Sequence, residues 1–218
     1  MLFNNMGRVV TALEVQKRNP NRVNVHLDGG YAFSLSRIVA AWLSVGRDLS
    51  DPEVEKLQQD ENFEQAAQVA LKYIAYKSRT SAEVRKRLQE AKYPEFVIEH
   101  TISRFTQNGL INDGQYARDW VGDRQVFHPR SARQMEFELR RKGVQREEIE
   151  AALSEVVDDE QMAYQLACQK INRYDSLDFK EFRSRLGGML SRRGFSYETV
   201  TRVINRMWSE RKTGITQD

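Results

Sequence analysis

Arginine and lysine side chains gather at three places in the sequence, at spacings of about fifty residues. Arginine dominates these groups, and its planar guanidinium makes forked contacts with carboxylates or phosphates. Arg118 and Arg124 stand beside Asp119 and Asp123, and this mixture of signs favours a protein partner over bare DNA. The candidate partner-binding residues are Arg79, Arg85, Lys86, Arg87, Arg118, Arg124, Arg130, Arg133, Arg140, Arg141, Lys142, Lys180, Arg183, Arg185, Arg192 and Arg193.

Two interpretations of these cations stay open. Arg79 aligns with Arg130 and Lys142 with Arg193, so repetition could draw a stripe of positive charge along one face. Alternatively, the cations form a solvated face stabilised by neighbouring glutamates. The chain has 34 basic and 31 acidic residues, a net charge of +3. Bulk charge is therefore a poor argument for nucleic acid, and a positive surface requires segregation of charges onto one side.

Residue patterns typical of catalysis or metal binding are missing from the sequence. No glycine-rich phosphate loop with a following lysine is present. The histidines lack metal-ligand spacing, and Asp158-Asp159 reads as a helix start. Cys168 is the single cysteine, which excludes an internal disulfide, and we expect it to be a buried small side chain. The histidines are His26, His100 and His128. We expect a non-enzyme without cofactor or metal.

Membrane and export signals are also missing. The first residues lack the charged-then-apolar pattern of a secretory signal. No apolar run approaches the ~20 residues that a transmembrane helix needs. We expect a cytoplasmic protein with no membrane contact.

A pattern of apolar residues returns every 51 positions, so the elements that carry the cations must themselves repeat. Eighteen aligned positions are all apolar, in a chain that is 40% hydrophobic. The aligned sets are Val84/Met135/Leu186, Leu88/Leu139/Leu190, Tyr93/Val144/Phe195, Ile98/Ile149/Val200, Ile102/Leu153/Ile204 and Phe105/Val156/Met207. Their spacings of three and four predict two amphipathic helices in each repeat, with these residues as core.

A further helix precedes each pair, over residues 63–77, 115–126 and 160–173. Its register is weaker, although Ala66/Ala117/Cys168 and Val69/Trp120/Ile171 still align, and we interpret Trp120 as core. In the third repeat, length is expected to shift from this helix to the following loop.

Capping and turn residues mark the middle helices. Thr80/Glu83, Ser131/Gln134 and Asp178/Glu181 read as N-terminal capping pairs. Gly143 and Gly194 suit the left-handed residue after a helix, while Lys92 takes that place in the first repeat, before Pro94.

Residues 7–36 alternate in period two and are broken by Asn19-Pro20-Asn21 and Asp28-Gly29-Gly30. This predicts a three-stranded meander. We expect short helices over residues 36–45 and 51–59, the second with Asp51 as N-cap and Pro52 in its first turn. The meander could cap the first repeat or offer a second docking surface.

The expected fold is mainly α, a tandem array of three three-helix repeats after a small N-terminal β-meander and short helices. The expected divisions are residues 1–60, 61–112, 113–157 and 158–211, with a flexible tail at 212–218.

The run Arg79–Leu88 (RTSAEVRKRL), the junction Gly109–Asp113 (GLIND) and the three tandem units resemble the bacterial RecX regulatory family. The resemblance covers about residues 63–210. It implies a modulator, usually an inhibitor, of the recombinase RecA. Members are understood to lie in the groove of the RecA filament on single-stranded DNA, where they hinder strand exchange and ATP turnover during recombination, repair and the SOS response.

Two other functions stay open. A helix-turn-helix-like DNA-binding module is the alternative, because three-helix units with a basic helix are typical of it. A structural adaptor for an unknown partner is the third. The expected partners are the RecA filament, with weak direct DNA contact, and the expected state is a monomer.

Overall fold

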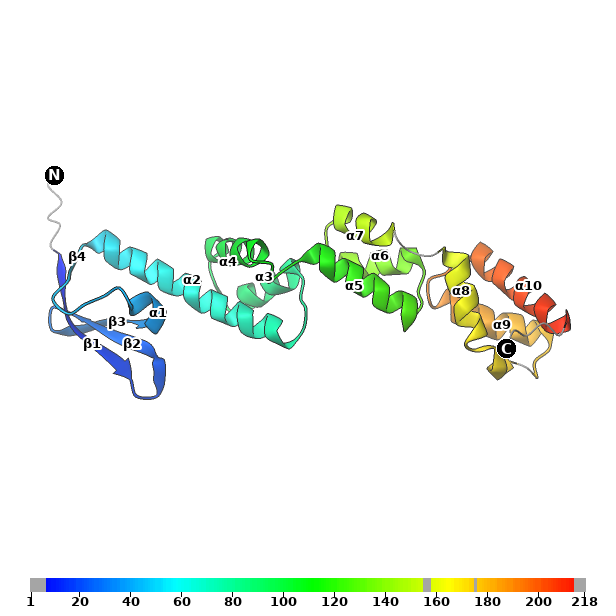
Figure 1. Ribbon diagram of the computed structural model, residues 1–218, viewed down its shortest axis with the longest axis horizontal. Helices are drawn as coiled ribbons and strands as arrows, with labels where there is room; N and C mark the ends of the chain where they lie inside the picture. Colours follow the sequence, from blue (N-terminus) through cyan, green and yellow to red (C-terminus); the bar gives the residue numbers. More distant parts are fainter. Residues whose placement is uncertain (1–6, 155–157, 175, 214–218) are drawn as a thin grey trace. The chain divides into compact units, whose positions relative to one another are not determined.

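The computed structural model describes residues 7–154, 158–174 and 176–213. Within these ranges the protein is mainly helical, with one antiparallel sheet at its N-terminal end (Figure 1). The chain packs as two compact units. The first runs to Ser78 and resumes over Val84–Ile111; the second holds Arg79–Glu83 and the chain from Asn112 onward.

The sheet of the first unit contains the predicted meander, as β1 (Arg8–Gln16), β2 (Asn19–Leu27) and β3 (Gly30–Ser36). A short fourth strand, β4 (Asp48–Leu49), pairs with β1 and gives the order β3-β2-β1-β4. Sequence reasoning missed β4 because two residues carry no periodicity. The helix predicted over 36–45 is only α1 (Arg37–Ala40), since the chain must turn back to bring β4 beside β1.

One long helix, α2 (Asp51–Tyr76), replaces two predicted ones. The prediction of an end near Gln59 was wrong, because neither glycine nor proline follows to interrupt the helix. Its N-cap is Ser50 rather than Asp51, and Ser50 forms a capping box with Glu53. The helix buries Val54 in the core of the sheet and Ala66 and its neighbours in a second core, so it joins both halves of this unit.

Glu61 fixes α2 to the sheet. It is only 5% exposed, and its carboxylate accepts hydrogen bonds from the Ser36 amide at 2.5 Å, from Arg22 at 2.9 Å and from the Gln65 amide group at 2.6 Å. A buried carboxylate is tolerated where donors and a cation surround it. The sequence pattern alone would place Glu61 on a solvated helix face.

The remaining helices form the predicted three-helix repeats. The first repeat combines the second half of α2 with α3 (Ser81–Glu90) and α4 (Glu95–Gln107). The second unit contains the other two repeats, whose apolar cores are continuous. Its helices are α5 (Asp113–Val126), α6 (Ala132–Arg141), α7 (Arg146–Leu153), α8 (Asp159–Cys168), α9 (Phe179–Ser191) and α10 (Tyr197–Thr213), with a 3₁₀ turn, η1 (Ile171–Tyr174).

The repeating apolar positions are core positions, as predicted. Val84, Met135 and Leu186 are all fully buried, as are Leu88, Leu139 and Leu190. Of the other aligned positions that the structure describes, only Tyr93 and Leu153 are half-buried rather than buried; Val156 lies outside the described residues. This aligned burial is the physical basis of the repeat, because a helix pair alone cannot enclose a core.

The predicted caps and turns are present. The amides of Glu83, Gln134 and Glu181 donate to Thr80, Ser131 and Asp178 at 2.8–3.2 Å. Lys92, Gly143 and Gly194 have φ of 63°, 77° and 90°.

Two predictions about single positions were wrong. Cys168 is exposed, because the neighbouring Ala167 takes the buried place that Ala66 and Ala117 occupy in the other repeats. Trp120 is only half-buried, and its indole N–H donates to Glu138 at 3.1 Å. In the third repeat the helix expected over 160–173 ends at Cys168 and the chain passes into η1, so length shifts to the segment that follows, as predicted. Of the predicted tail, residues 212 and 213 still belong to α10, and 214–218 lie outside the described residues.

Candidate protein-interaction surface

Within the second unit, the segment before α3 contacts the turn after α6. The hydroxyl of Thr80 donates to the carbonyl of Lys142 at 2.7 Å, and the Lys142 ammonium donates to Glu83 at 2.8 Å. Burial alone would raise the pKa of the Glu83 carboxyl, but the hydrogen bonds from Lys142 and the Thr80 amide outweigh it and hold that pKa below its usual value. We call this set of contacts the first joint.

A second joint repeats the first one 51 residues later. The hydroxyl of Ser131 donates to the carbonyl of Gly194 at 2.8 Å, and the Ser131 amide donates to the carbonyl of Arg193 at 3.1 Å. The amide that follows each capping residue also donates to an aspartate at 2.8 Å: Ser81 to Asp113, and Ala132 to Asp159. The capping residues thus bind both their own helix and the following repeat.

Glycine is required at both joints. A Cβ on Gly143 would lie 2.3 Å from the Cβ of Ala82, and a Cβ on Gly194 would lie 2.6 Å from that of Gln134. The positive φ at both glycines also disfavours any side chain there. The sequence indicated these glycines as helix ends but not as points of contact between segments.

An ion-pair cluster surrounds Trp120 beside the first joint. Arg124 and Arg130 both contact Glu138, at 3.2 and 3.1 Å, and the Arg124 guanidinium lies over the Trp120 ring at 4.1 Å from its centre. Arg79 lies 3.7 Å from Glu83. These cations pair with half-buried acids and cover an aromatic face, so their arrangement is structural.

Six of the candidate basic residues are therefore engaged inside the fold. All six are only half-exposed: Arg79, Arg85, Arg124, Arg130, Lys142 and Arg193. Arg85 contacts Glu95 and Glu99, and Arg193 donates to the carbonyl of Pro129 at 3.4 Å. Both aligned pairs, Arg79/Arg130 and Lys142/Arg193, are in this group. The charges that repeat in the sequence thus serve the joints and the cluster, and do not by themselves draw a stripe on the surface.

The other ten candidates are exposed: Lys86, Arg87, Arg118, Arg133, Arg140, Arg141, Lys180, Arg183, Arg185 and Arg192. Some have local partners. Arg87 lies near Glu90, Arg118 donates to Gln115, Arg140 pairs with Glu136, and Arg141 lies over Phe137.

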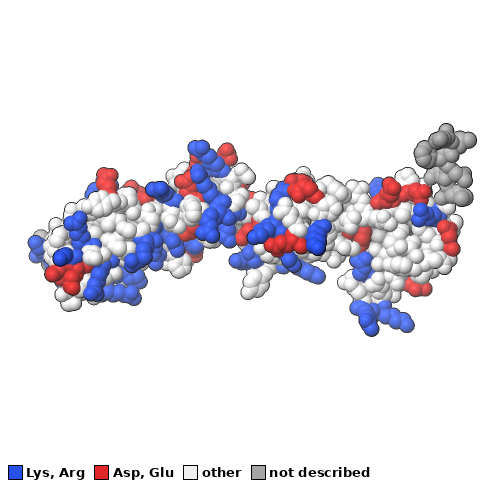
Figure 2. Space-filling model, turned by 180° about the vertical axis from the view of Figure 1, so that it is seen from behind, with Lys and Arg blue, Asp and Glu red and all other residues white. Residues whose placement is uncertain are grey.

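Four exposed cations in α9 and at its C-terminal end lack an acidic partner among the described residues. Lys180, Arg183, Arg185 and Arg192 form no ion pair with any residue that the structure describes, and Arg183 donates only to the Tyr197 hydroxyl at 3.3 Å. α9 buries Phe182, Leu186 and Leu190. Lys180 and Arg183 lie along one edge of this buried stripe, Arg185 and the C-cap residue Arg192 lie along the other, and all four side chains are exposed. Figure 2 shows Lys and Arg gathered over the second and third repeats on the face turned to the viewer. We call Lys180, Arg183, Arg185 and Arg192 the α9 face.

The described residues hold no group of three or more His, Cys, Asp and Glu side chains placed to bind a metal ion. In the same residues, every helix is too short or too polar to cross a bilayer.

Four family models match this chain in the order of its elements. The regulatory protein RecX N-terminal domain matches residues 8–50, and the first, second and third three-helix domains of RecX match residues 66–105, 112–153 and 158–204. The chain belongs to the RecX family. The resemblance predicted from sequence covered about residues 63–210. The match to the RecX N-terminal domain extends it to residues 8–50, which contain the meander and β4.

Sequence relatives agree over nearly the whole length. The regulatory protein RecX of Levilactobacillus brevis is 30% identical over 90% of this chain and 75% of its own. That of Clostridium beijerinckii is 29% identical over 91% and 95%. Among solved structures, a regulatory protein RecX has a TM-score of 0.72, 24% identity and 91% coverage of this chain, which shows the shared fold. RecX from Lactobacillus salivarius has a TM-score of 0.60 and 25% identity over 67% of this chain. The family is one of regulatory proteins.

One surface of this RecX-family chain was missed by sequence reasoning. Trp42 is 82% exposed and lines a hollow between the α1–β4 segment on one side and α2 and α4 on the other. A sequence signal for this surface was present. Ile38, Trp42 and Val45 are large apolar residues in one short segment, which is too short to bury all three side chains.

Proposed function

We propose that this chain binds the helical filament that RecA forms on single-stranded DNA and limits its growth, ATP turnover and strand exchange. Membership of the RecX family supports a regulatory role, and the α9 face is the observation that carries the proposal. Cations without internal partners are available to the acidic side chains of a protein surface or to phosphates. The protein acts by binding and not by chemistry, as a cytoplasmic monomer in recombination, DNA repair and the SOS response.

Several weak contacts on one chain suit a filament. An exposed ion pair contributes only about 0–1 kcal/mol. A filament presents the same protomer surface many times, so a chain with several contact sites gains from linked binding, which raises affinity by roughly 10²–10⁴. Exposed cations on α3, α6 and α9 supply such sites on each repeat.

The test is co-sedimentation with RecA filaments on single-stranded DNA, together with the rate of RecA ATP hydrolysis. The variant Lys180→Glu/Arg183→Glu/Arg185→Glu changes only exposed side chains of α9. The matched control, Lys17→Glu/Arg18→Glu/Arg37→Glu, reverses three exposed cations of the first unit and alters net charge equally. We expect the α9 variant to bind about ten- to hundredfold more weakly and to inhibit less, and the control to resemble the unchanged protein.

Equal weakening by both variants would mean that net charge, and not the α9 face, governs binding. Failure of the unchanged protein to sediment with filaments would contradict the proposal itself.

Direct DNA binding is the second candidate, because the α9 face also suits phosphates. It predicts binding to naked duplex DNA without RecA, with log K falling by about 0.9 per phosphate contact as log salt rises. Titration of labelled duplex at two salt concentrations distinguishes the two functions, since a filament-specific protein binds the duplex weakly at both.

A further inference from the structure

The most exposed tryptophan of the described chain stands in an apolar group of the first unit. Trp42 is 82% exposed, Ile38 is 64% exposed and Val45 is 63% exposed, all within the segment that joins β3 to β4. Large apolar side chains left together in water mark interaction sites. Tryptophan is also among the residues most enriched at the energetic centres of protein interfaces.

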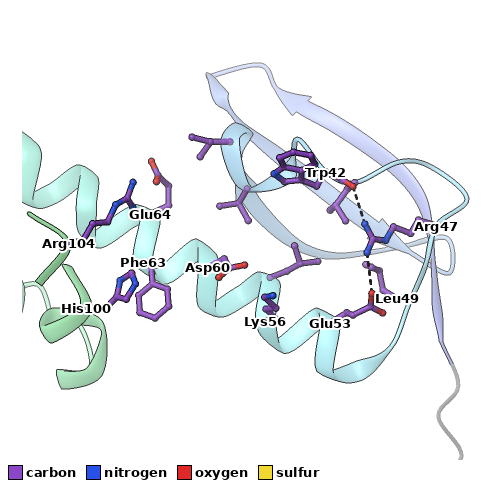
Figure 3. A pocket seen from close by; sticks show the side chains of 14 residues that line it. Trp42, Arg47, Leu49, Glu53, Lys56, Asp60, Phe63, Glu64, His100 and Arg104 are labelled. Atoms are coloured by element: carbon purple, nitrogen blue, oxygen red, sulfur yellow. Dashed lines mark hydrogen bonds and ion pairs between the residues drawn. The ribbon is translucent and has the colours of Figure 1, made fainter. Parts of the chain in front are cut away.

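A hollow of about 580 Å³ opens beside Trp42, between the α1–β4 segment on one side and α2 and α4 on the other. Its apolar lining comes from Val39, Leu43, Leu49, Leu57 and Phe63. Figure 3 shows Trp42 across from the side chains that α2 contributes. We call this hollow the Trp42 groove.

Both walls of the Trp42 groove are held in place. Arg47 donates to the carbonyl of Trp42 at 3.2 Å and to Glu53 on α2 at 3.2 Å, which ties the segment to the helix (Figure 3). At the other end, the Phe63 ring stacks on His100 with centroids 4.0 Å apart. A groove that is ordered before binding avoids much of the entropy loss of association.

The spacing of the α2 residues gives the groove its length. Glu53, Lys56, Leu57, Asp60 and Glu64 line it at intervals of three and four, so the groove follows one face of α2 for about 16 Å. That is three turns of helix. Grooves of this kind take an amphipathic helix whose apolar residues lie at i, i+3 or i+4, and i+7.

The charges at the groove have both signs. Its charged lining comprises Arg47, Lys56 and Arg104 together with Glu53, Asp60 and Glu64. Within the described chain, Lys56, Asp60 and Arg104 form no ion pair, and Glu64 accepts only from the Gln68 amide at 3.1 Å. Equal numbers of cations and anions do not suit a phosphate backbone, whereas they complement a helix that carries lysine or arginine together with glutamate or aspartate.

We propose that the Trp42 groove binds an amphipathic helix of the partner protein, with Trp42 packing against its apolar stripe and Lys56, Asp60 and Arg104 pairing with flanking charges. The inference rests on the proposed function for the identity of the partner. It gives the N-terminal unit a contact of its own, distinct from the α9 face.

A photoreactive benzophenone amino acid in place of Trp42 tests the contact directly. The full chain is irradiated with RecA filaments on single-stranded DNA, and the cross-linked peptide is identified by mass spectrometry. The matched control carries the same group in place of Tyr76, which is 89% exposed at the far end of α2. We expect position 42 to cross-link to one helical RecA peptide with apolar residues three and four apart, well above the yield at position 76.

Affinity gives an independent measurement. We expect Trp42→Ala, and separately Lys56→Glu/Asp60→Lys, to weaken filament binding about tenfold or more. The controls Tyr76→Ala and Glu55→Lys should stay within about twofold, since neither side chain lines the groove. Both groove variants alter side chains at the surface, so unchanged circular dichroism and unfolding midpoints are the accompanying check.

Several results would overturn the inference. Cross-linking from position 42 to DNA would indicate base stacking, cross-linking to a second copy of this chain would indicate self-association, and no cross-link above the control would leave the groove without a partner. The unchanged protein is sedimented with filaments in parallel. If it binds and any of these results is obtained, the proposed function stands and only the proposed role of the Trp42 groove is rejected.

Discussion

The hydroxyl of Thr80 donates a hydrogen bond of 2.7 Å to the carbonyl oxygen of Lys142, across sixty-two positions of the sequence. Thr80 is fully buried and also caps α3 through the Glu83 amide. Ser131 and Gly194 repeat the relationship at 2.8 Å. One side chain therefore starts a helix and holds the next repeat, which explains why Thr80 and Ser131 are separated by the same interval as the core positions.

Thr80→Val keeps the shape of this side chain and removes its hydroxyl. We expect the free energy of unfolding to fall by about 1–2 kcal/mol, because α3 loses its cap and the Lys142 carbonyl loses a donor. Urea denaturation followed by circular dichroism measures the change. Thr80→Ser keeps the hydroxyl and should cost less; an equal loss would assign the effect to the methyl group.

Gly143→Ala should destabilise the first joint, since its Cβ would clash with Ala82 at 2.3 Å and φ is 77°. We expect a loss of about 2–3 kcal/mol in unfolding free energy. Gly46→Ala is the control, because Gly46 has a φ of 89° and open space around it. It should lose only the free energy that a positive φ costs alanine, about 1 kcal/mol. Adding Ala82→Gly should recover part of the loss at Gly143; no recovery would contradict the steric explanation.

The pair Glu83–Lys142 predicts a pH dependence. The pKa of Glu83 lies below its ordinary 4.5, so its stabilisation is present above that value and disappears as pH falls through the lowered pKa. The hydrogen bond to Glu83 raises the pKa of Lys142, which therefore stays charged throughout this range. Unfolding midpoints of the chain and of Glu83→Gln should differ at pH 7 and converge once the pH falls below the lowered pKa of Glu83. A constant difference would exclude this carboxylate as the cause.

Glu61→Ala should destabilise the first unit by about 3 kcal/mol, because the Ser36 amide and Arg22 would lose a buried acceptor. Glu61→Gln retains an acceptor oxygen and should cost less. Glu55→Ala, at an exposed position of the same helix, serves as the control and should be nearly neutral. Thermal unfolding of the three variants is the measurement, and similar midpoints for all of them would contradict the anchoring role of Glu61.

The repeats could be predicted because their signals are local and occur three times. Apolar residues such as Leu88, Leu139 and Leu190 recur at helical spacing, and the residues at helix ends are chosen by backbone geometry alone. The N-terminal meander followed in the same way from alternation and turn residues. The continuity of α2 was not predicted, because a helix that continues is indicated only by the absence of stop signals such as glycine or proline.

The role of each cation was the least predictable part. Arg79, Arg130 and Lys142 have the same charge and similar sequence surroundings as Arg133 or Arg185, yet the first three contact Glu83 and Glu138 while the others point to solvent. Lys142 meets Glu83 across fifty-nine positions, and Arg124 meets Glu138 across fourteen, so these pairs depend on how separate segments pack. The cations that recur in the alignment, Arg79/Arg130 and Lys142/Arg193, are those held at the joints and in the ion-pair cluster.

By itself the sequence determined the fold class, the repeats, the core positions and the family, because periodicity and capping act through neighbours along the chain. Only the tertiary structure decided which charges are paired and which remain on the α9 face. It also decided that Glu61 is buried and that Trp42 borders a groove. These depend on contacts between distant segments, and such contacts fix burial, which in turn fixes whether a side chain stabilises the fold or is available to a partner.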